Sequence, residues 1–187
     1  MVRRPRAPEK PRTDRPFVSA GQDPDDLQAD NHQYLNDFWR FSLAVYGQPG
    51  VAEECLGLQD KFGLNTNLLL FCAWLGRSGI VATRDDLEGA TRSIAYWHDH
   101  VVRPLRGVRR HMKLHHEDVS ALRAHVQRSE IEAEQVEQAM LFDYAQSIVP
   151  GAGRDAVVHN VNEYLAMVSG AVTGAPVLIA AARNQKP

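Results

Sequence analysis

Five cationic side chains fall within an eleven-residue stretch that contains no Asp or Glu. They are Arg103, Arg106, Arg109, Arg110 and Lys113. If this stretch is helical, all of them except Arg109 lie on one face, because they follow one another at intervals of three or four residues. Such a face can grip phosphate or carboxylate groups. The alternative is that the cations pair with glutamates of neighbouring helices.

Pro104 lies inside this basic stretch, and the recognition site is predicted beside it. Proline lacks an N–H, so in a helix it leaves the carbonyl of His100 without its usual partner. Glutamates of the following helix are expected across from this point, with Glu130 opposite His100 and Glu134 opposite Tyr96. The candidate ligand- or partner-binding residues are therefore Trp97, His100, Arg103, Arg106, Arg110, Glu130 and Glu134.

The other motifs give no support for a metal or a cofactor. His111 and His115 are four residues apart, but no carboxylate completes an HExxH pattern. The Glu-x-x-His pairs of di-iron bundles are absent as well. The dense glutamates Glu130, Glu132, Glu134 and Glu137 are instead expected to form a solvated helix face. Local signatures of a nucleophile or of a phosphate-binding loop are also missing, so no catalytic residue is named and no cofactor is expected.

Composition favours a soluble protein with a sizeable core. Apolar residues make up 44% of the 187 residues, and the formal net charge is -2. Cys55 and Cys72 lie in apolar helical patterns, which favours buried reduced thiols over a disulfide. No apolar run approaches the roughly 20 residues that a spanning helix needs. A cytoplasmic protein with no membrane contact is therefore expected.

The chain divides into a tail, residues 1–30, and one helical domain, residues 31–187. The tail contains five prolines and few large apolar residues, so it cannot bury enough surface to offset the entropy lost on ordering. Helical periodicity fills most of the remainder. Helices are expected at 31–46, 51–62, from 66 to about 78, from 84 to about 113, and at 117–148, 154–169 and 177–182.

The two longest helices are expected to form one antiparallel hairpin. An apolar stripe runs from Leu87 to Met112, straight through Pro104, and a second runs from Val119 to Met140. When the short link folds the helices back on each other, the stripes match position by position, with Ile94 beside Val136 and Val108 beside Leu122. The fold class is therefore all-α, a single multi-helix bundle with a long kinked hairpin.

Several segments resemble an uncharacterised proteobacterial family of conserved hypothetical proteins that share an all-helical domain of unknown function. The similar segments are FWRFS at 38–42 with Tyr46, LQD at 58–60, NTNLLLFCAWL at 65–75, PLR at 104–106 with Arg109 and Arg110, and IEAEQVEQ at 131–138. The resemblance covers residues 31–148 and implies a bacterial protein. It implies no activity, so no site residue is carried over from it.

Three functional interpretations remain open from the sequence. The first is a non-catalytic helical binding or adaptor protein that acts on a protein partner, which requires an exposed apolar or charged patch. The second is a binder of a small anionic ligand or nucleic acid through the face from Arg103 to Lys113, whose binding would be salt-sensitive. The third is an enzyme of unrecognised type, which requires a concave pocket with titratable groups of displaced pKa.

Overall fold

The computed structural model describes residues 34–115, 117–149, 151, 155–170 and 174–185, and the predicted tail lies outside them. The predicted all-α class is confirmed across these residues. The helices are α1 (Asp37–Tyr46), α2 (Val51–Phe62), α3 (Thr66–Arg77), α4 (Arg84–Trp97), the π-turn η3 (His98–Val102), α5 (Arg103–His115), the 3₁₀ turn η4 (Glu117–Val119), α6 (Ser120–Ala145), α7 (Ala156–Ser169) and α8 (Pro176–Asn184).

Helix boundaries follow local capping. α2 has the predicted bounds, whereas α1 begins at Asp37 and not at residue 31. The cause is Asn36, whose side chain accepts a hydrogen bond from the Trp39 N–H at 2.8 Å and so caps the helix. α4 begins with a capping box, in which Thr83 and Asp86 bond each other's backbone N–H groups.

α3 is the central helix, as its continuous apolar run predicts. Residues 66–73 and both Leu75 and Gly76 are buried, and α1, α6, α7 and α8 pack around it. α7 comes closest, because Gly76 has no side chain and a Cβ there would overlap the backbone of Ala156 and Val157. Cys55 and Cys72 are free and buried in this core, and burial raises the pKa of both thiols.

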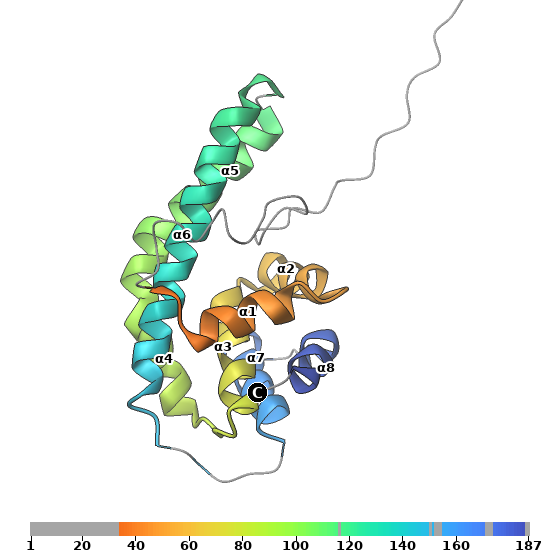
Figure 1. The fold of residues 1–187 in the computed structure, drawn as a ribbon, viewed down its shortest axis with the longest axis vertical. Coiled ribbons are helices and arrows are strands. Elements are labelled where there is room, and N and C mark those ends of the chain that lie inside the picture. The colour runs from red at the N-terminus through yellow and green to blue at the C-terminus, as the bar shows by residue number, and fades with distance from the viewer. Residues whose placement is uncertain (1–33, 116, 150, 152–154, 171–173, 186–187) are drawn as a thin grey trace, which may run out of the picture.

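The predicted hairpin consists of α4, η3 and α5 on one side and α6 on the other (Figure 1). The helical run continues from Arg84 to His115 without interruption, and it accommodates Pro104 by the π-turn just before it. Within that turn, the N–H of Arg103 bonds the His98 carbonyl five residues back, so the register has already shifted where the proline cannot donate. Trp97 Nε1 donates to the Ala133 carbonyl at 2.9 Å, in agreement with the expected pairing of these positions.

The outer parts of α5 and α6 extend together beyond the other helices (Figure 1). The apolar stripes are less buried there. Ile94 is buried, but Val108 is 46% and Leu122 is 51% exposed. The inner part of the hairpin is covered by the other helices, while each helix of the outer part has mainly its partner helix to pack against.

None of the helices in the described part of the chain is long and apolar enough to cross a membrane.

Candidate functional site

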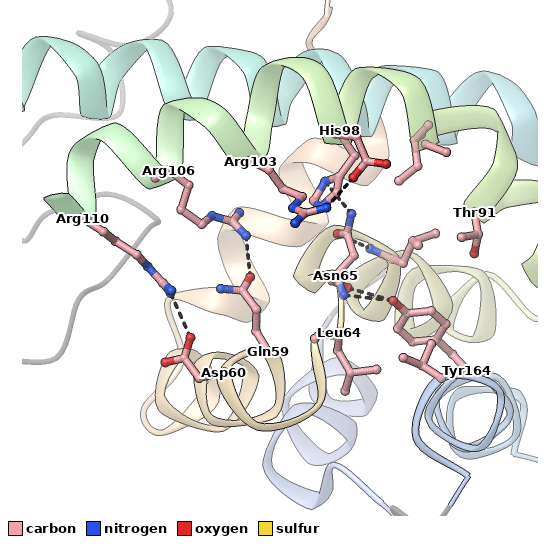
Figure 2. Close-up of a pocket in the computed structure, with 17 residues that line it drawn as sticks. Gln59, Asp60, Leu64, Asn65, Thr91, His98, Arg103, Arg106, Arg110 and Tyr164 are labelled. Atoms are coloured by element: carbon pink, nitrogen blue, oxygen red, sulfur yellow. Dashed lines mark hydrogen bonds and ion pairs between the residues drawn. The ribbon is translucent and has the colours of Figure 1, made fainter.

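A cavity of about 670 Å³ lies between the hairpin, the junction of α2 and α3, and α7. Figure 2 shows its charged end, where Arg106 and Arg110 of α5 face Gln59 and Asp60 of α2. Asn65, His98 and Tyr164 lie toward its other end. Apolar side chains also line the cavity. These are Leu64, Leu68, Ile94, Ala95 and Val168. A volume of this size suits a small organic molecule.

Arg106 connects the cavity to a buried layer of charge. Its Nη1 donates to Gln59 Oε1 at 2.7 Å and its Nε donates to Glu130 Oε1 at 3.1 Å. Its Nη2 donates to Glu134 Oε1. The Arg106 side chain is only 12% exposed, so these charge-assisted bonds fix its guanidinium as a wall of the cavity.

Arg109 is buried beside Arg106 and is not among the residues that line the cavity. Its guanidinium donates from Nε and Nη2 to both oxygens of Glu130, and both side chains are almost fully buried. A buried pair of this kind is strongly destabilised when one partner is removed, because the remaining charge has no compensation. The inner arginines are therefore bound to glutamates, as the alternative interpretation of the basic stretch predicts.

The carboxyl group of Glu134 has a strongly raised pKa. Burial raises its pKa to about 7, against the opposing charge of Arg106. Its second oxygen, Oε2, has no hydrogen-bond partner among the described residues. Both observations agree with a carboxyl group that takes up a proton near neutral pH.

Glu137 is fully buried and organises the middle of the cavity wall. Its Oε1 accepts hydrogen bonds from Asn65 Nδ2 at 2.9 Å and Asn67 Nδ2 at 3.0 Å. Its Oε2 lies 2.9 Å from His98 Nδ1. Asn65 Nδ2 lies 3.0 Å from the same ring nitrogen. Both contacts involve Nδ1, so they orient the ring of a histidine that lines the cavity.

Asn65 caps α3 and also lines the cavity. Its Oδ1 caps α3 by accepting from the N–H groups of Asn67 and Leu68, while its Nδ2 bonds Glu137. Its own N–H donates to Tyr164 Oη at 3.0 Å. α7 therefore fixes the start of α3, and with it the amide that holds the buried carboxylate.

Among the described residues, two arginines at the cavity pair with exposed aspartates. Arg103 Nη1 lies 2.8 Å from Asp99 Oδ1, and Arg110 Nη2 lies 2.9 Å from Asp60 Oδ1. The hydrogen bond from Arg103 is the largest cause that lowers the pKa of Asp99. Exposed pairs contribute about 0–1 kcal/mol each, so an incoming anion could replace either aspartate at little cost.

The structure brings together most, but not all, of the residues predicted for the site. Arg103, Arg106 and Arg110 line the cavity, and Glu130 and Glu134 lie buried behind Arg106. Trp97 and His100 do not line it. Trp97 is bonded to α6, and His100 is exposed, bonded to the Tyr96 carbonyl and stacked on the Tyr96 ring at 4.2 Å.

The glutamates of α6 bond the arginines of α5. Glu130 bonds Arg106 and Arg109, and Glu134 bonds Arg106. Side chains lean toward the N-terminus of their own helix, so that arginines of α5 reach back to these carboxylates. The expected solvated face is wrong, because only Glu132 of the four glutamates is exposed.

Sequence reasoning missed several residues of the site on α2, α7 and the hairpin itself. These residues are Gln59, Asp60, Asn65, His98, Glu137 and Tyr164. Glu137 was predicted only as part of a solvated helix face. The missed signal is that Glu130, Glu134 and Glu137 recur at intervals of four and three residues, which places them on one helix face with the buried Ile131 and Gln138 beside them.

Among the described residues, no group of three or more His, Cys, Asp or Glu side chains is placed to hold a metal ion. The polar groups that line the cavity include guanidinium groups, one oriented imidazole, amides, the carboxylates of Asp60 and Asp99 and the hydroxyl of Tyr164.

Comparison with known proteins leaves the activity open. No curated protein and no solved structure matches the chain. One family model matches residues 37–141, which include α1 to α5 and most of α6 and so all the charged residues of the cavity wall, while Tyr164 and Val168 of α7 lie beyond the match. The chain belongs to this family, described as "Protein of unknown function (DUF2390)".

Proposed function

We propose that the chain binds a small organic anion, a phosphate or a carboxylate, in the cavity between α2, α3, α5 and α7. The observation that carries the proposal is the difference between its arginines. Arg106 is buried and saturated by Glu130, Glu134 and Gln59. Arg103 and Arg110 line the same cavity, but each pairs with an exposed aspartate.

The buried residues Arg106 and Glu137 support this binding by holding other residues of the cavity wall in place. Arg106 holds Gln59 at one end, and Glu137 holds His98 at the other. Pre-oriented groups lose less conformational entropy when a ligand arrives. The charged head of the anion would lie between Arg103 and Arg110, and its organic part against Leu68 and Ile94, with His98 Nε2 between these two regions.

Calorimetric titration of the full chain at fixed ionic strength tests the proposal, with inorganic phosphate and acetate as separate probes. We expect saturable binding of one of them, which also identifies the preferred anion. Changing Arg103 and Arg110 to Gln should weaken it by at least about tenfold per arginine, since hydrogen bonds to charged groups contribute about 1.5–3 kcal/mol. Arg92→Gln, an exposed arginine of α4 outside the cavity, is the control.

Two results would contradict the proposal. One is the absence of saturable binding with both probes. The other is binding that Arg92→Gln weakens as much as the two cavity substitutions do, because that would indicate a general response to charge and not a site.

A further inference from the structure

The buried layer behind the cavity carries more negative than positive charge. It contains the guanidinium groups of Arg106 and Arg109 and, beside them, the imidazole of His98. Three glutamates of α6 face these groups, and none of them is more than 2% exposed: Glu130, Glu134 and Glu137. Two guanidinium groups can balance two carboxylates. While His98 is neutral, one buried carboxylate is therefore left without a counter-charge among these groups.

The hydrogen bonds identify Glu134 as that carboxylate. Both oxygens of Glu130 accept from arginines, and both oxygens of Glu137 contact polar side chains at the start of α3 and in η3. Glu134 Oε1 accepts from Arg106, but its Oε2 is buried and has no hydrogen-bond partner among the described residues. A charged oxygen in such a place is costly, and a proton on the carboxyl group removes the charge.

The surroundings of Glu134 favour this proton. Burial is the largest cause that raises its pKa, to about 7, and the charges of Glu130 and Glu137 act in the same direction, against that of Arg106 on α5. Tyr46 of α1 also acts on this position, and burial raises the pKa of its phenol, so that it stays neutral. The other neighbouring elements reach the partners of Glu134 or the adjacent Ala133 through Gln59 of α2, Asn67 of α3, Trp97 of α4 and His98 of η3.

Arg106 connects Glu134 to the cavity. Figure 2 shows it between Arg103 and Arg110 along α5, and all three arginines line the cavity. An anion bound by Arg103 and Arg110 would therefore lie beside Arg106 and share its positive charge with Glu134. Two negative charges around one guanidinium disfavour each other, so a bound anion would raise the pKa of Glu134 further. Proton uptake by Glu134 would strengthen anion binding by the same factor.

We propose that the cavity takes up its anion together with a proton from the solvent, and that Glu134 is the group that binds this proton. The inference rests on the proposed function, because it describes how anion binding in that cavity responds to pH. A proton on Glu134 removes the negative charge that competes with the anion for Arg106. Anion binding should therefore tighten as the pH falls from about 8 to about 6, and the anion should be released more readily as the pH rises.

Calorimetric titration of the full chain at fixed ionic strength tests the inference, with sulfate and acetate as the probes. Sulfate replaces phosphate, because a phosphate group itself titrates with a pKa of about 6. The affinity of the preferred probe should be about fivefold higher or more at pH 6 than at pH 8, as typical couplings between sites allow. At pH 7 the heats measured in two buffers of different protonation enthalpy should show an uptake of up to about half a proton per anion, because Glu134 is already half protonated there.

Glu134→Gln separates the proton from the rest of the site. Glutamine imitates the neutral carboxyl group, and its side-chain oxygen can still accept from Arg106. At pH 8 this variant should bind the anion about fivefold more tightly than the wild type, a gain that loss of folding cannot produce. It should also lose the proton uptake and the pH dependence. Glu132→Gln, on the exposed side of the same helix, is the matched control and should keep both.

Three results would overturn the inference. Saturable binding by the wild type with no pH dependence and no proton uptake would overturn it alone and leave the proposed function standing. A pH dependence that Glu134→Gln retains and His98→Gln abolishes would assign the proton to the imidazole. Absence of saturable binding of both probes at pH 6 and at pH 8 would contradict the proposed function and this inference with it.

Discussion

His98 Nδ1 lies 2.9 Å from Glu137 Oε2, so a fully buried carboxylate of α6 orients an imidazole at the cavity. The same carboxylate accepts hydrogen bonds from Asn65 and Asn67 at the start of α3. One side chain therefore links the hairpin, the central helix and the cavity. Removing it should affect both the stability of the fold and the order of the cavity wall.

The first prediction concerns this carboxylate. Glu137→Ala should lower the free energy of unfolding by about 3 kcal/mol, because it leaves buried amide and imidazole donors without an acceptor. Glu132→Ala, on the exposed side of the same helix, should change it by no more than about 0.5 kcal/mol. Urea unfolding followed by circular dichroism measures both. Equal effects of the two substitutions would show that the buried network is not a source of stability.

The second prediction is a pH dependence that comes from Glu134. Its pKa rises from an ordinary 4.5 to about 7 in the folded protein, so the folded state binds the proton more tightly than the unfolded state. The resulting stabilisation is complete below pH 4.5 and is lost as the pH rises to about 7. It amounts to about 3 kcal/mol at most.

Glu134→Gln isolates this contribution. Between pH 4.5 and pH 8 the wild type should lose up to about 3 kcal/mol of stability relative to the variant. The measurement is urea unfolding of both proteins at several pH values. A difference that does not change with pH would mean that Glu134 stays ionised throughout, held by Arg106.

The third prediction uses two helical glycines with opposite surroundings. Gly76→Ala should destabilise the protein by more than about 2 kcal/mol, because its Cβ would overlap the backbone of α7. Gly57→Ala should stabilise it by about 0.5–1 kcal/mol, because alanine has the higher helix propensity and meets nothing within 4 Å. Thermal unfolding distinguishes the two. A Gly76→Ala variant as stable as the wild type would mean that α3 and α7 are not in close contact.

The fourth prediction separates two histidines that are two residues apart. His98 lines the cavity, whereas His100 is exposed and stacks on Tyr96. His98→Ala should weaken the binding of the preferred anion about tenfold, by loss of one hydrogen bond of about 1.4 kcal/mol. His100→Ala should leave it unchanged. The reverse order of effects in the same titration would place the site on the outer face of the π-turn.

Local patterns allowed much of the fold to be predicted from the sequence. Helical periodicity predicted the bounds of α2 at residues 51–62, and it predicted helices close to the observed α3 and α4. The antiparallel hairpin followed from two matching stripes. The exposed state of Val108 and Leu122 could not be predicted in this way, because a stripe shows which face is apolar but not how far the neighbouring helices extend along it.

The cavity was predictable only on the side that the basic stretch supplies. Arg103, Arg106 and Arg110 share a face that periodicity identifies without a tertiary structure. Asn65 and Tyr164 are 99 residues apart and meet only when α3 and α7 pack together. Burial of Glu137 was equally inaccessible, because a glutamate on a polar-looking helix is usually exposed, and the partners that make burial possible come from α3 and the π-turn.

The most direct test of the proposed anion site follows the arginine Nε–Hε resonances of the ¹⁵N-labelled full chain during titration with inorganic phosphate, or with acetate if calorimetry shows that acetate is preferred. The account predicts saturable shifts for Arg103 and Arg110, which line the cavity with exposed aspartates as partners, and little change for the exposed Arg40 and Arg92 of other surfaces. Shifts of similar size at all four arginines, or none at Arg103 and Arg110, would contradict it.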